Sequence, residues 1–401
     1  MSALQPTESE KLPQRPKQSG SLGIGRIAGI EIRIHFTWLL AFIFITWTLA
    51  AGFFPQQYED WETTTYWIAG GIASILLFVS VLVHELAHSL VARARGMPVN
   101  SIVLFIFGGA SQIEEEPEEP GSEFIMALVG PVTSLVLAGV FWGVGQAMAG
   151  QGGPVDAIVT YLALINALLG GFNLLPGLPL DGGRLLRSAI SYFTGDLKKA
   201  TNIAAGVGKL LAWGLIALGF FLLLGGNLLS GLWIAFIGWF LSNAASETGR
   251  QMTLKETLSG VEVREAMNEA PCVIGPDTKV DEIVHEIFMQ GKARAAAICQ
   301  DGEPVGIVTP SDVKEVPREN WGSTRVREIM TQEPLYSVET TEDLNTAFKM
   351  LARNDINQLL VVEGGELRGI LSRADIIQYI QLSQELGLSG ENKGTLRAEA
   401  S

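Results

Sequence analysis

Six long apolar stretches constrain the fold of this chain more than any other feature of its sequence. They cover residues 36–54, 67–91, 124–149, 155–175, 207–224 and 228–245. Each approaches or exceeds the roughly 20 residues that an α-helix needs to cross the hydrocarbon core of a bilayer. The composition agrees, because 48% of the 401 residues are hydrophobic and only 17% are charged, which is too apolar for a soluble protein of this size. The sequence therefore predicts a polytopic α-helical membrane protein with six transmembrane helices.

Basic residues predict how these helices are oriented. The first, third and fifth connections between the apolar stretches contain no Lys or Arg. The N-terminal arm and the even-numbered connections contain Lys11, Arg15, Lys17, Arg26, Arg33, Arg93, Arg95, Arg184, Arg187, Lys198 and Lys199. Because positively charged connections stay in the cytoplasm, we expect both termini to be cytoplasmic, in a multi-pass protein of the plasma membrane. Residues 1–22, rich in Gln, Ser and Pro, are predicted to form a disordered arm, followed by a membrane domain at residues 23–250.

The C-terminal part, residues 251–401, is predicted to be a soluble cytoplasmic domain, and it is acidic. It contains 15 basic and 25 acidic residues, so it carries −10 of the net charge of −14. An acidic domain argues against nucleic acid as a partner and against docking on anionic lipid. Both cysteines, Cys272 and Cys299, lie in this part, and we expect a reducing cytosol to keep them out of a disulfide.

The pentapeptide HELAH at residues 84–88 places three ionisable groups inside the second apolar stretch. Such groups are costly within a membrane and therefore indicate function. On a helix, residues four apart share a face, so His84 and His88 can offer two imidazole nitrogens to one metal ion. Glu85 would then reach a water molecule beside that ion. This arrangement is typical of zinc hydrolases.

A catalytic zinc ion usually has three protein ligands and keeps one position open. The best candidate for the third ligand is Asp181, in the sequence NLLPGLPLDGGR at residues 173–184. Its Gly and Pro residues cannot continue a helix, so the backbone must break there at membrane depth, which is tolerated only where it packs in protein or lines a wet cavity. His88 lies shortly before Arg93, and Asp181 shortly before Arg184, so both ligand sets are expected at similar depth near the cytoplasmic face.

These two motifs together resemble the site-2 protease family of zinc intramembrane metalloproteases, over roughly residues 24–246. The resemblance implies one Zn²⁺ per chain, held by His84, His88 and Asp181, with Glu85 as the catalytic acid and base. It further implies that Asn173 helps to hold the substrate or the developing oxyanion. The expected substrate is a membrane-spanning segment of another protein within the lipid bilayer.

Residues 99–113, with the sequence VNSIVLFIFGGASQI, are β-branched and aromatic but too short to cross a membrane. They predict a strand or hairpin that enters the membrane from the cytoplasm. Its edge could pair with an extended substrate by strand addition, or the strand could only seal the fold. An acidic run at residues 114–119 follows and is expected to form a solvated loop at the gate of the site.

The C-terminal part repeats itself at a spacing of 63 residues. Arg264-Glu-Ala-Met267 matches Arg327-Glu-Ile-Met330, and GIVTPSD at residues 306–312 matches GILSRAD at residues 369–375. Each copy, at residues 263–318 and 326–382, reads as a short strand, a helix, two strands and a closing helix. The two copies are expected to form one α/β module.

This repeat resembles a tandem cystathionine-β-synthase (CBS) domain pair. By that resemblance, Asp312 and Asp375 would bind the ribose hydroxyls of ATP, ADP or AMP, and Thr309 and Ser372 would lie near phosphate. A carboxylate can accept two hydroxyl hydrogen bonds, so the chemistry is reasonable. Many such pairs bind no nucleotide and only dimerise, so a homo-oligomer is the alternative reading of the module.

Three functions remain open from the sequence. The leading hypothesis is a zinc endopeptidase of membrane segments that an adenine-nucleotide-sensing CBS module regulates. The alternative is a CBS-regulated membrane ion transporter or channel, in which the same residues would line a cation pathway. Histidines at i and i+4 match a zinc site better than the oxygen-rich ligation of magnesium. A pseudoprotease scaffold is the third reading, and the presence of every expected catalytic group weakens it.

Overall fold

The computed structural model describes residues 20–106, 108–113, 117, 119–148, 153–269, 274–290 and 294–386. The chain divides into two compact units, Lys17–Met252 and Thr253–Ser401. Of the predicted disordered arm, residues 1–19 lie outside the described residues, and Ser21 and Leu22 already belong to the first strand. The acidic run at residues 114–119 also lies largely outside them.

Six apolar helices long enough to cross a membrane are present in the described part of the chain, which confirms the predicted fold class. They are α1 (Thr37–Thr48) continued by η1 (Leu49–Phe53) and α2 (Phe54–Gln57), α3 (Thr63–Ala94), α4 (Pro120–Ala147), α5 (Pro154–Asn173), α7 (Leu197–Leu224) and α8 (Leu228–Leu258). Local sequence sets several helix starts. Proline, which lacks the N–H that a first turn cannot use, begins α4 and α5. The Asp196 carboxylate caps α7 by accepting from the Lys199 amide at 2.8 Å.

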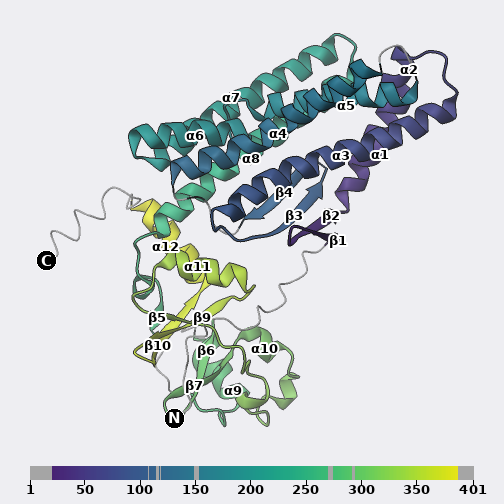
Figure 1. Cartoon of the computed structure of the whole chain (residues 1–401). Helices are drawn as coiled ribbons and strands as arrows, with labels where there is room; N and C mark the ends of the chain where they lie inside the picture. Colours follow the sequence, from purple (N-terminus) through teal and green to yellow (C-terminus); the bar gives the residue numbers. More distant parts are fainter. Residues whose placement is uncertain are drawn as a thin grey trace. The chain divides into compact units, whose positions relative to one another are not determined.

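A short amphipathic helix, α6 (Asp181–Thr194), lies between the fourth and fifth membrane helices in the chain. The preceding helix α5 ends at Asn173, and residues 174–180 form turns, as the Gly and Pro content of this segment predicts. The helix α6 itself was not expected from the sequence. It packs beside α4 and α7 (Figure 1).

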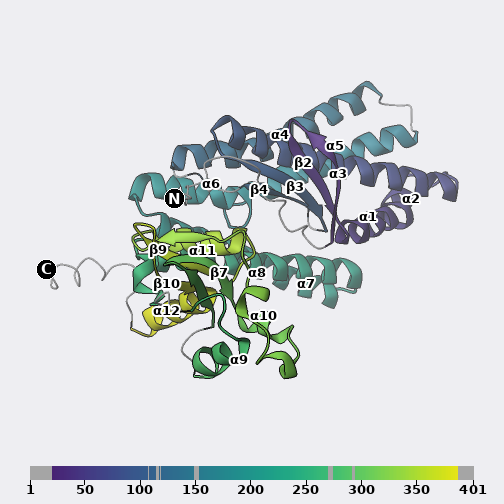
Figure 2. The same cartoon turned by 90° about the horizontal axis from the view of Figure 1, so that it is seen from below.

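A four-stranded sheet lies along α3 (Figure 2). Its strands are β1 (Ser21–Ile27), β2 (Ile30–His35), β3 (Val99–Phe105) and β4 (Gly108–Ile113), in the order β1-β2-β3-β4. The strands β2 and β3 are parallel, and the other neighbours are antiparallel. The hairpin β3–β4 corresponds to the predicted β segment. Fully buried Ile30 and Ile102 pack with Met126 of α4 in the core beneath the sheet.

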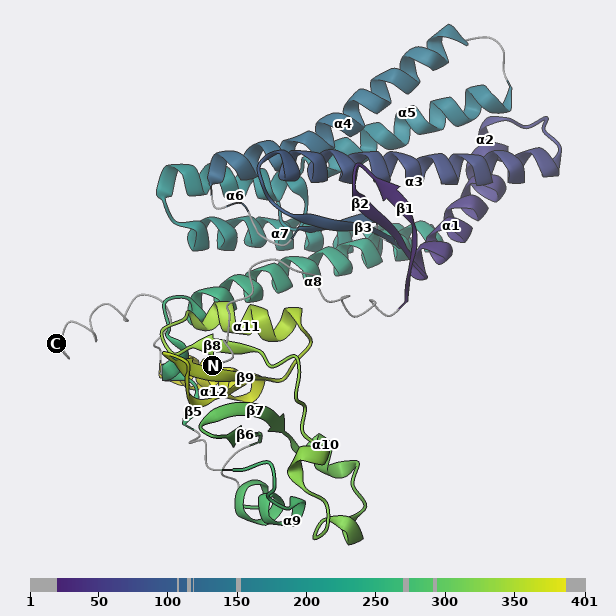
Figure 3. The same cartoon turned by 60° about the horizontal axis from the view of Figure 1, so that its bottom comes forward.

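The second unit contains the two repeats. The first copy has η2 (Val263–Glu265), β5 (Asn268–Glu269), α9 (Val280–Ile283), η3 (Val284–Phe288), β6 (Ala296–Gln300), β7 (Glu303–Val308) and α10 (Pro310–Lys314). After η4 (Arg318–Asn320), the second has η5 (Val326–Glu328), β8 (Ser337–Glu339), α11 (Leu344–Arg353), β9 (Gln358–Glu363), β10 (Glu366–Ser372) and α12 (Arg373–Glu385). Figure 3 shows α11 and α12 beside the strands of the second copy.

The two copies exchange their leading segments. Asn268 of the first copy pairs with Ile370 of the second, and Thr331, the counterpart of Asn268, pairs with Ile307, the counterpart of Ile370. A buried cluster made of Ala295, Ala297, Cys299, Leu360, Leu367 and Ile370 joins the copies. The copies therefore fold as one module.

The expectation for the cysteines is wrong for Cys299, which is disulfide-bonded. Cys272 lies outside the described residues.

Candidate metal centre

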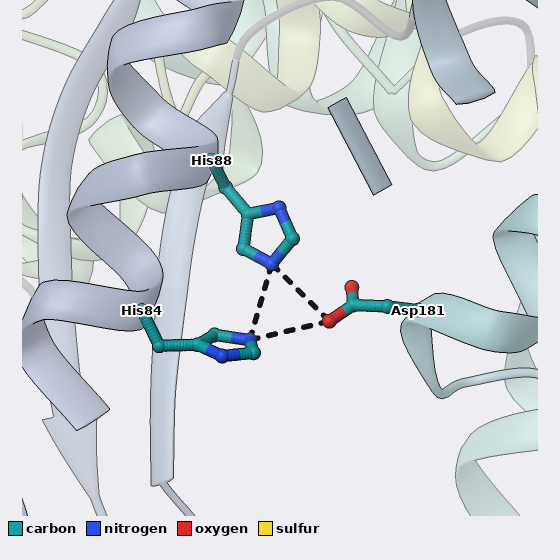
Figure 4. A group of neighbouring side chains, drawn as sticks. All are labelled: His84, His88 and Asp181. Carbon is teal, nitrogen blue, oxygen red and sulfur yellow. Dashed lines mark hydrogen bonds and ion pairs between the residues drawn. The ribbon is translucent and has the colours of Figure 1, made fainter. Parts of the chain in front are cut away.

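Three side chains that are distant in sequence meet at one point. The Nε2 atoms of His84 and His88 lie 3.2 Å apart, and each lies 3.2 Å from Oδ2 of Asp181. Figure 4 shows the three side chains directed toward one another. Both imidazoles are buried, and the Asp181 side chain is 14% exposed. Within the described residues, these three side chains form the group of His, Cys, Asp or Glu residues that could hold a metal ion.

The size of this triangle fits a zinc ion. Zinc lies 2.0–2.1 Å from nitrogen and oxygen ligands in a tetrahedral site, which places those ligand atoms about 3.3 Å from one another. The observed separations of 3.2 Å are close to that value. A zinc ion held by these three atoms would keep one position open for a reactant.

The outer nitrogens of both histidines are held by buried partners. Nδ1 of His88 donates to the carbonyl oxygen of Met126 at 2.6 Å, and Nδ1 of His84 shares a hydrogen bond with the Ser134 hydroxyl at 2.9 Å. A carbonyl can only accept, so Nδ1 of His88 carries a proton, and Nε2 is the ring atom left to bind a metal ion. Such partners orient the rings of metal-binding histidines.

Asp181 enters the triangle as the first residue of α6. Burial raises the pKa of its carboxyl, but the contacts with His84 and His88 outweigh burial and lower that pKa below its usual range. The carboxyl is therefore ionised, which is the form that binds a metal ion.

A glycine of α4 lies directly against the ligand nitrogens. A Cβ atom at Gly130 of α4 would lie 2.1 Å from Nε2 of His88 and 2.7 Å from Nε2 of His84. Only a residue without a side chain fits at this place. From the sequence, Gly130 is explained by helix packing alone, and its proximity to the ligand atoms could not be read from any pattern.

Glu85 contacts the inner face of β4. Its Oε2 accepts a hydrogen bond from the Ser111 hydroxyl at 2.8 Å, and that hydroxyl accepts one from Ser89 at 3.1 Å. A Cβ atom at Gly109 would lie 2.3 Å from Cγ of Glu85. Gly109 and Ser111 lie two residues apart on one strand and therefore share a face. The strand β4 thus fixes the glutamate, a role that sequence spacing does not reveal.

Asn173 does not join this cluster. It is the last residue of α5, and its amide donates to the Leu169 carbonyl at 3.0 Å. Among the described residues, its side chain makes no hydrogen bond to Glu85 or to the three candidate ligands.

The predicted nucleotide-binding residues form two helix caps. Oδ2 of Asp312 accepts from the amide at 2.7 Å and the hydroxyl at 2.8 Å of Thr309. Asp375 binds the amide and hydroxyl of Ser372 in the same way, and its Oδ1 also accepts from Asn268 at 2.6 Å. Each pair is a capping box, which satisfies the first amides of a helix. The same residues therefore have a structural role whether or not a ligand binds.

Comparison with known proteins identifies the family. The model of peptidase family M50 matches residues 72–154 and 146–215. Rip3 of Mycobacterium tuberculosis, a candidate zinc metalloprotease by name, is 34% identical over 369 residues, which cover 90% of this chain and 93% of that protein. The chain belongs to peptidase family M50. This M50 peptidase is an enzyme of the site-2 protease type, as the resemblance in its sequence implied. The family assignment decides against an ion transporter and against a pseudoprotease scaffold.

The M50 peptidase is also similar to other known proteins. The candidate zinc metalloprotease sll0528 of Synechocystis is 33% identical over 374 residues, which cover 91% of this chain and 97% of that protein. The CBS domain model matches residues 263–319 and 326–382. The structure of the site-2 protease from Methanocaldococcus jannaschii is 31% identical, with a TM-score of 0.42 over 57% of this chain and 95% of that one.

Proposed function

We propose that this M50 peptidase is a zinc-dependent endopeptidase that cleaves membrane-spanning segments of other proteins within the bilayer. The observation that carries the proposal is the triangle of His84, His88 and Asp181, which has the dimensions of a tetrahedral zinc site. It lies between a helix long and apolar enough to cross a membrane and the helix α6.

The proposed chemistry divides among few residues. His84, His88 and Asp181 hold the ion. Bound zinc supplies Lewis acidity, which makes water more acidic and a carbonyl carbon more electrophilic. Glu85 takes a proton from the attacking water and returns it to the leaving amine, while Ser111 keeps its carboxylate oriented. For Asn173 to hold the substrate or the developing oxyanion, its amide must leave the Leu169 carbonyl.

The strand β4 supports a mode of substrate binding. It is the terminal strand of its sheet as described, with β3 on one side, so its other edge can pair with an extended peptide. A transmembrane helix hides its peptide bonds, so a substrate must unwind before it can be cleaved. Pairing with β4 would unwind the substrate and bring its backbone to the strand that contacts Glu85.

The function is tested by zinc content and cleavage together. Purified protein should hold about one zinc per chain, and His84→Ala or Asp181→Ala should remove most of it. Glu85→Gln should keep the zinc and lose cleavage of a membrane-spanning peptide by several orders of magnitude, because both proton transfers lose their carrier. Full zinc content in Asp181→Ala, or normal cleavage by Glu85→Gln, would refute the assignment.

We also propose that the CBS module lies in the cytoplasm with both termini, at the plasma membrane, and adjusts proteolysis by binding ATP, ADP or AMP. Asp312 supports this, since only its Oδ2 is engaged among the described residues and Oδ1 remains for a ribose hydroxyl. A nucleotide can change the rate only by binding two arrangements of the enzyme with different affinity.

Calorimetry on the full chain in detergent tests the regulatory proposal. Asp312→Asn keeps one oxygen for the helix cap but weakens a ribose contact, so it should lower nucleotide affinity without loss of fold. The same nucleotide should shift the cleavage rate. If ATP, ADP and AMP all fail to bind the folded protein, dimerisation of the module becomes the better account.

A further inference from the structure

The helices α4 and α6 pack against each other, and two places along this packing matter here, one of which is the metal centre. At that place, Gly130 of α4 lies against the histidine nitrogens that contact Asp181 of α6. At the other, Glu123 in the first turn of α4 meets Arg187 of α6. The order of these contacts along the two helices shows that the helices are antiparallel.

The second contact is a buried ion pair. Glu123 is 3% exposed and Arg187 is 4% exposed. Oε1 of Glu123 accepts from Nε of Arg187 at 2.8 Å and also from its Nη2, and Nε of Arg184 lies 3.7 Å away. A buried charge without its partner is strongly unfavourable, so each residue holds the other in place.

The spacing connects this ion pair to the metal ligands. Glu123 and Gly130 are seven residues apart, and Asp181 and Arg187 are six apart, which correspond to about 10.5 Å and about 9 Å along a helix. The two contacts are thus almost equally far apart on both helices. The ion pair and the Ser188 hydroxyl, which donates to the Pro120 carbonyl, together resist sliding of α6 along α4. Asp181 is the first residue of α6, so its position depends on these contacts.

We propose that Glu123 and Arg187 are positioning residues whose ion pair sets the Asp181 carboxylate at ligand distance from His84 and His88. The inference deepens the proposed function and rests on it. Among the described residues, no hydrogen bond or ion pair is seen between either residue and the triangle, so their effect acts through the placement of α6. The pair is 64 residues apart in the chain, and it belongs to no motif in the sequence.

Cobalt(II) bound in place of zinc gives a direct test on the full chain, because its visible absorption is intense at four-coordinate sites and weak at higher coordination. Arg187→Met should weaken Co²⁺ binding by about 10- to 100-fold, as loss of outer partners does in other metal sites. Its visible absorption should fall toward that of Asp181→Ala, which lacks the third ligand. Wild-type affinity and absorption in folded Arg187→Met would overturn the inference.

A matched control is Arg95→Met. Arg95 is exposed and donates to Ser122, the neighbour of Glu123, and among the described residues it forms no hydrogen bond or ion pair with α6. This variant should therefore bind Co²⁺ as the wild type does. Equal weakening in Arg95→Met and Arg187→Met would count against a specific role. If the wild type itself binds no Co²⁺ or zinc, the proposed function fails first.

Arg187→Met leaves the Glu123 carboxylate buried and could fail to fold. The double variant Glu123→Leu, Arg187→Met removes both charges, and such replacements often leave stability unchanged. The Co²⁺ absorption of this double variant then tests whether the ion pair positions Asp181. A weakened or altered spectrum supports positioning by the ion pair, and an unchanged one shows that packing alone holds Asp181.

Discussion

At the scale of single residues, the most restrictive position is Gly130. Alanine there would place a methyl group 2.1 Å from Nε2 of His88, so either the ring or α4 must move. We expect Gly130→Ala to lower zinc content at least tenfold and to abolish cleavage. Metal analysis of the purified variant measures this.

Gly139→Ala provides the control for that variant. Gly139 lies on the same helix, but a Cβ atom there meets nothing within 4 Å. The change should leave zinc and activity as they are. If Gly130→Ala retained full zinc, the close contact between α4 and the ligand nitrogens would be unimportant for binding.

Ser111 is the second residue with a testable role. Its hydroxyl donates to Oε2 of Glu85, and a hydrogen bond to a charged group contributes about 1.5–3 kcal/mol. If that orientation is needed in the transition state, Ser111→Ala should lower kcat about 10- to 100-fold with little change in KM. Kinetics on a membrane-spanning peptide measure both constants.

Ser111→Thr retains a hydroxyl at the same position and should restore much of the rate. Zinc content should stay normal in both variants, because Ser111 contacts no candidate ligand in the described structure. An unchanged kcat in Ser111→Ala would show that Gly109 and the strand backbone orient Glu85 without the hydroxyl.

At the scale of elements, the helices α7 and α8 approach unusually closely at Gly219. A Cβ atom there would lie 2.6 Å from the amide nitrogen of Ala235 and the carbonyl oxygen of Gly231. Gly219→Ala should therefore destabilise the membrane unit by about 1–3 kcal/mol through overpacking. Gly214→Ala, on the same helix but facing open space, should be neutral or stabilising. Thermal unfolding in detergent compares the two.

The long helices were predicted from the sequence, whereas short elements such as β1, β2 and α6 were not. Apolar runs of membrane length have few alternatives, so six helices follow from them. The strand β1, with the sequence SLGIGRI, contains two glycines and is exposed along most of its length, so it lacks the alternation that predicts strands. The helix α6 starts with Asp-Gly-Gly, which reads as a turn.

The candidate ligands were predictable because His84 and His88 have the i, i+4 spacing of metal ligands and Asp181 follows a break marked by Gly and Pro. Their supports were not, since a backbone carbonyl such as that of Met126 and a hydroxyl such as that of Ser134 leave no pattern in sequence. The same holds for the ion pair of Glu123 and Arg187, because only the packing of α6 on α4 brings its members together.

At the scale of the whole molecule, the two repeats cannot be treated as separate domains. Residues near the start of each copy pair with the last strand of the other, and the cluster around Cys299 contains side chains from both. We expect the module to unfold in one transition. Hydrogen exchange should therefore show similar global protection for β7 and β10, and clearly separate values would contradict this.

The exchanged segments have a consequence for how such a module can be shortened. A chain that ends after residue 325 would keep the whole first copy in sequence, but β5 would lose its partner strand β10 and Ile307 its pairing with Thr331. Unpaired strand edges and uncovered apolar residues invite aggregation and proteolysis. Loss of one copy would thus yield an unstable tail rather than a simpler sensor, so we expect the two copies to be stable only together.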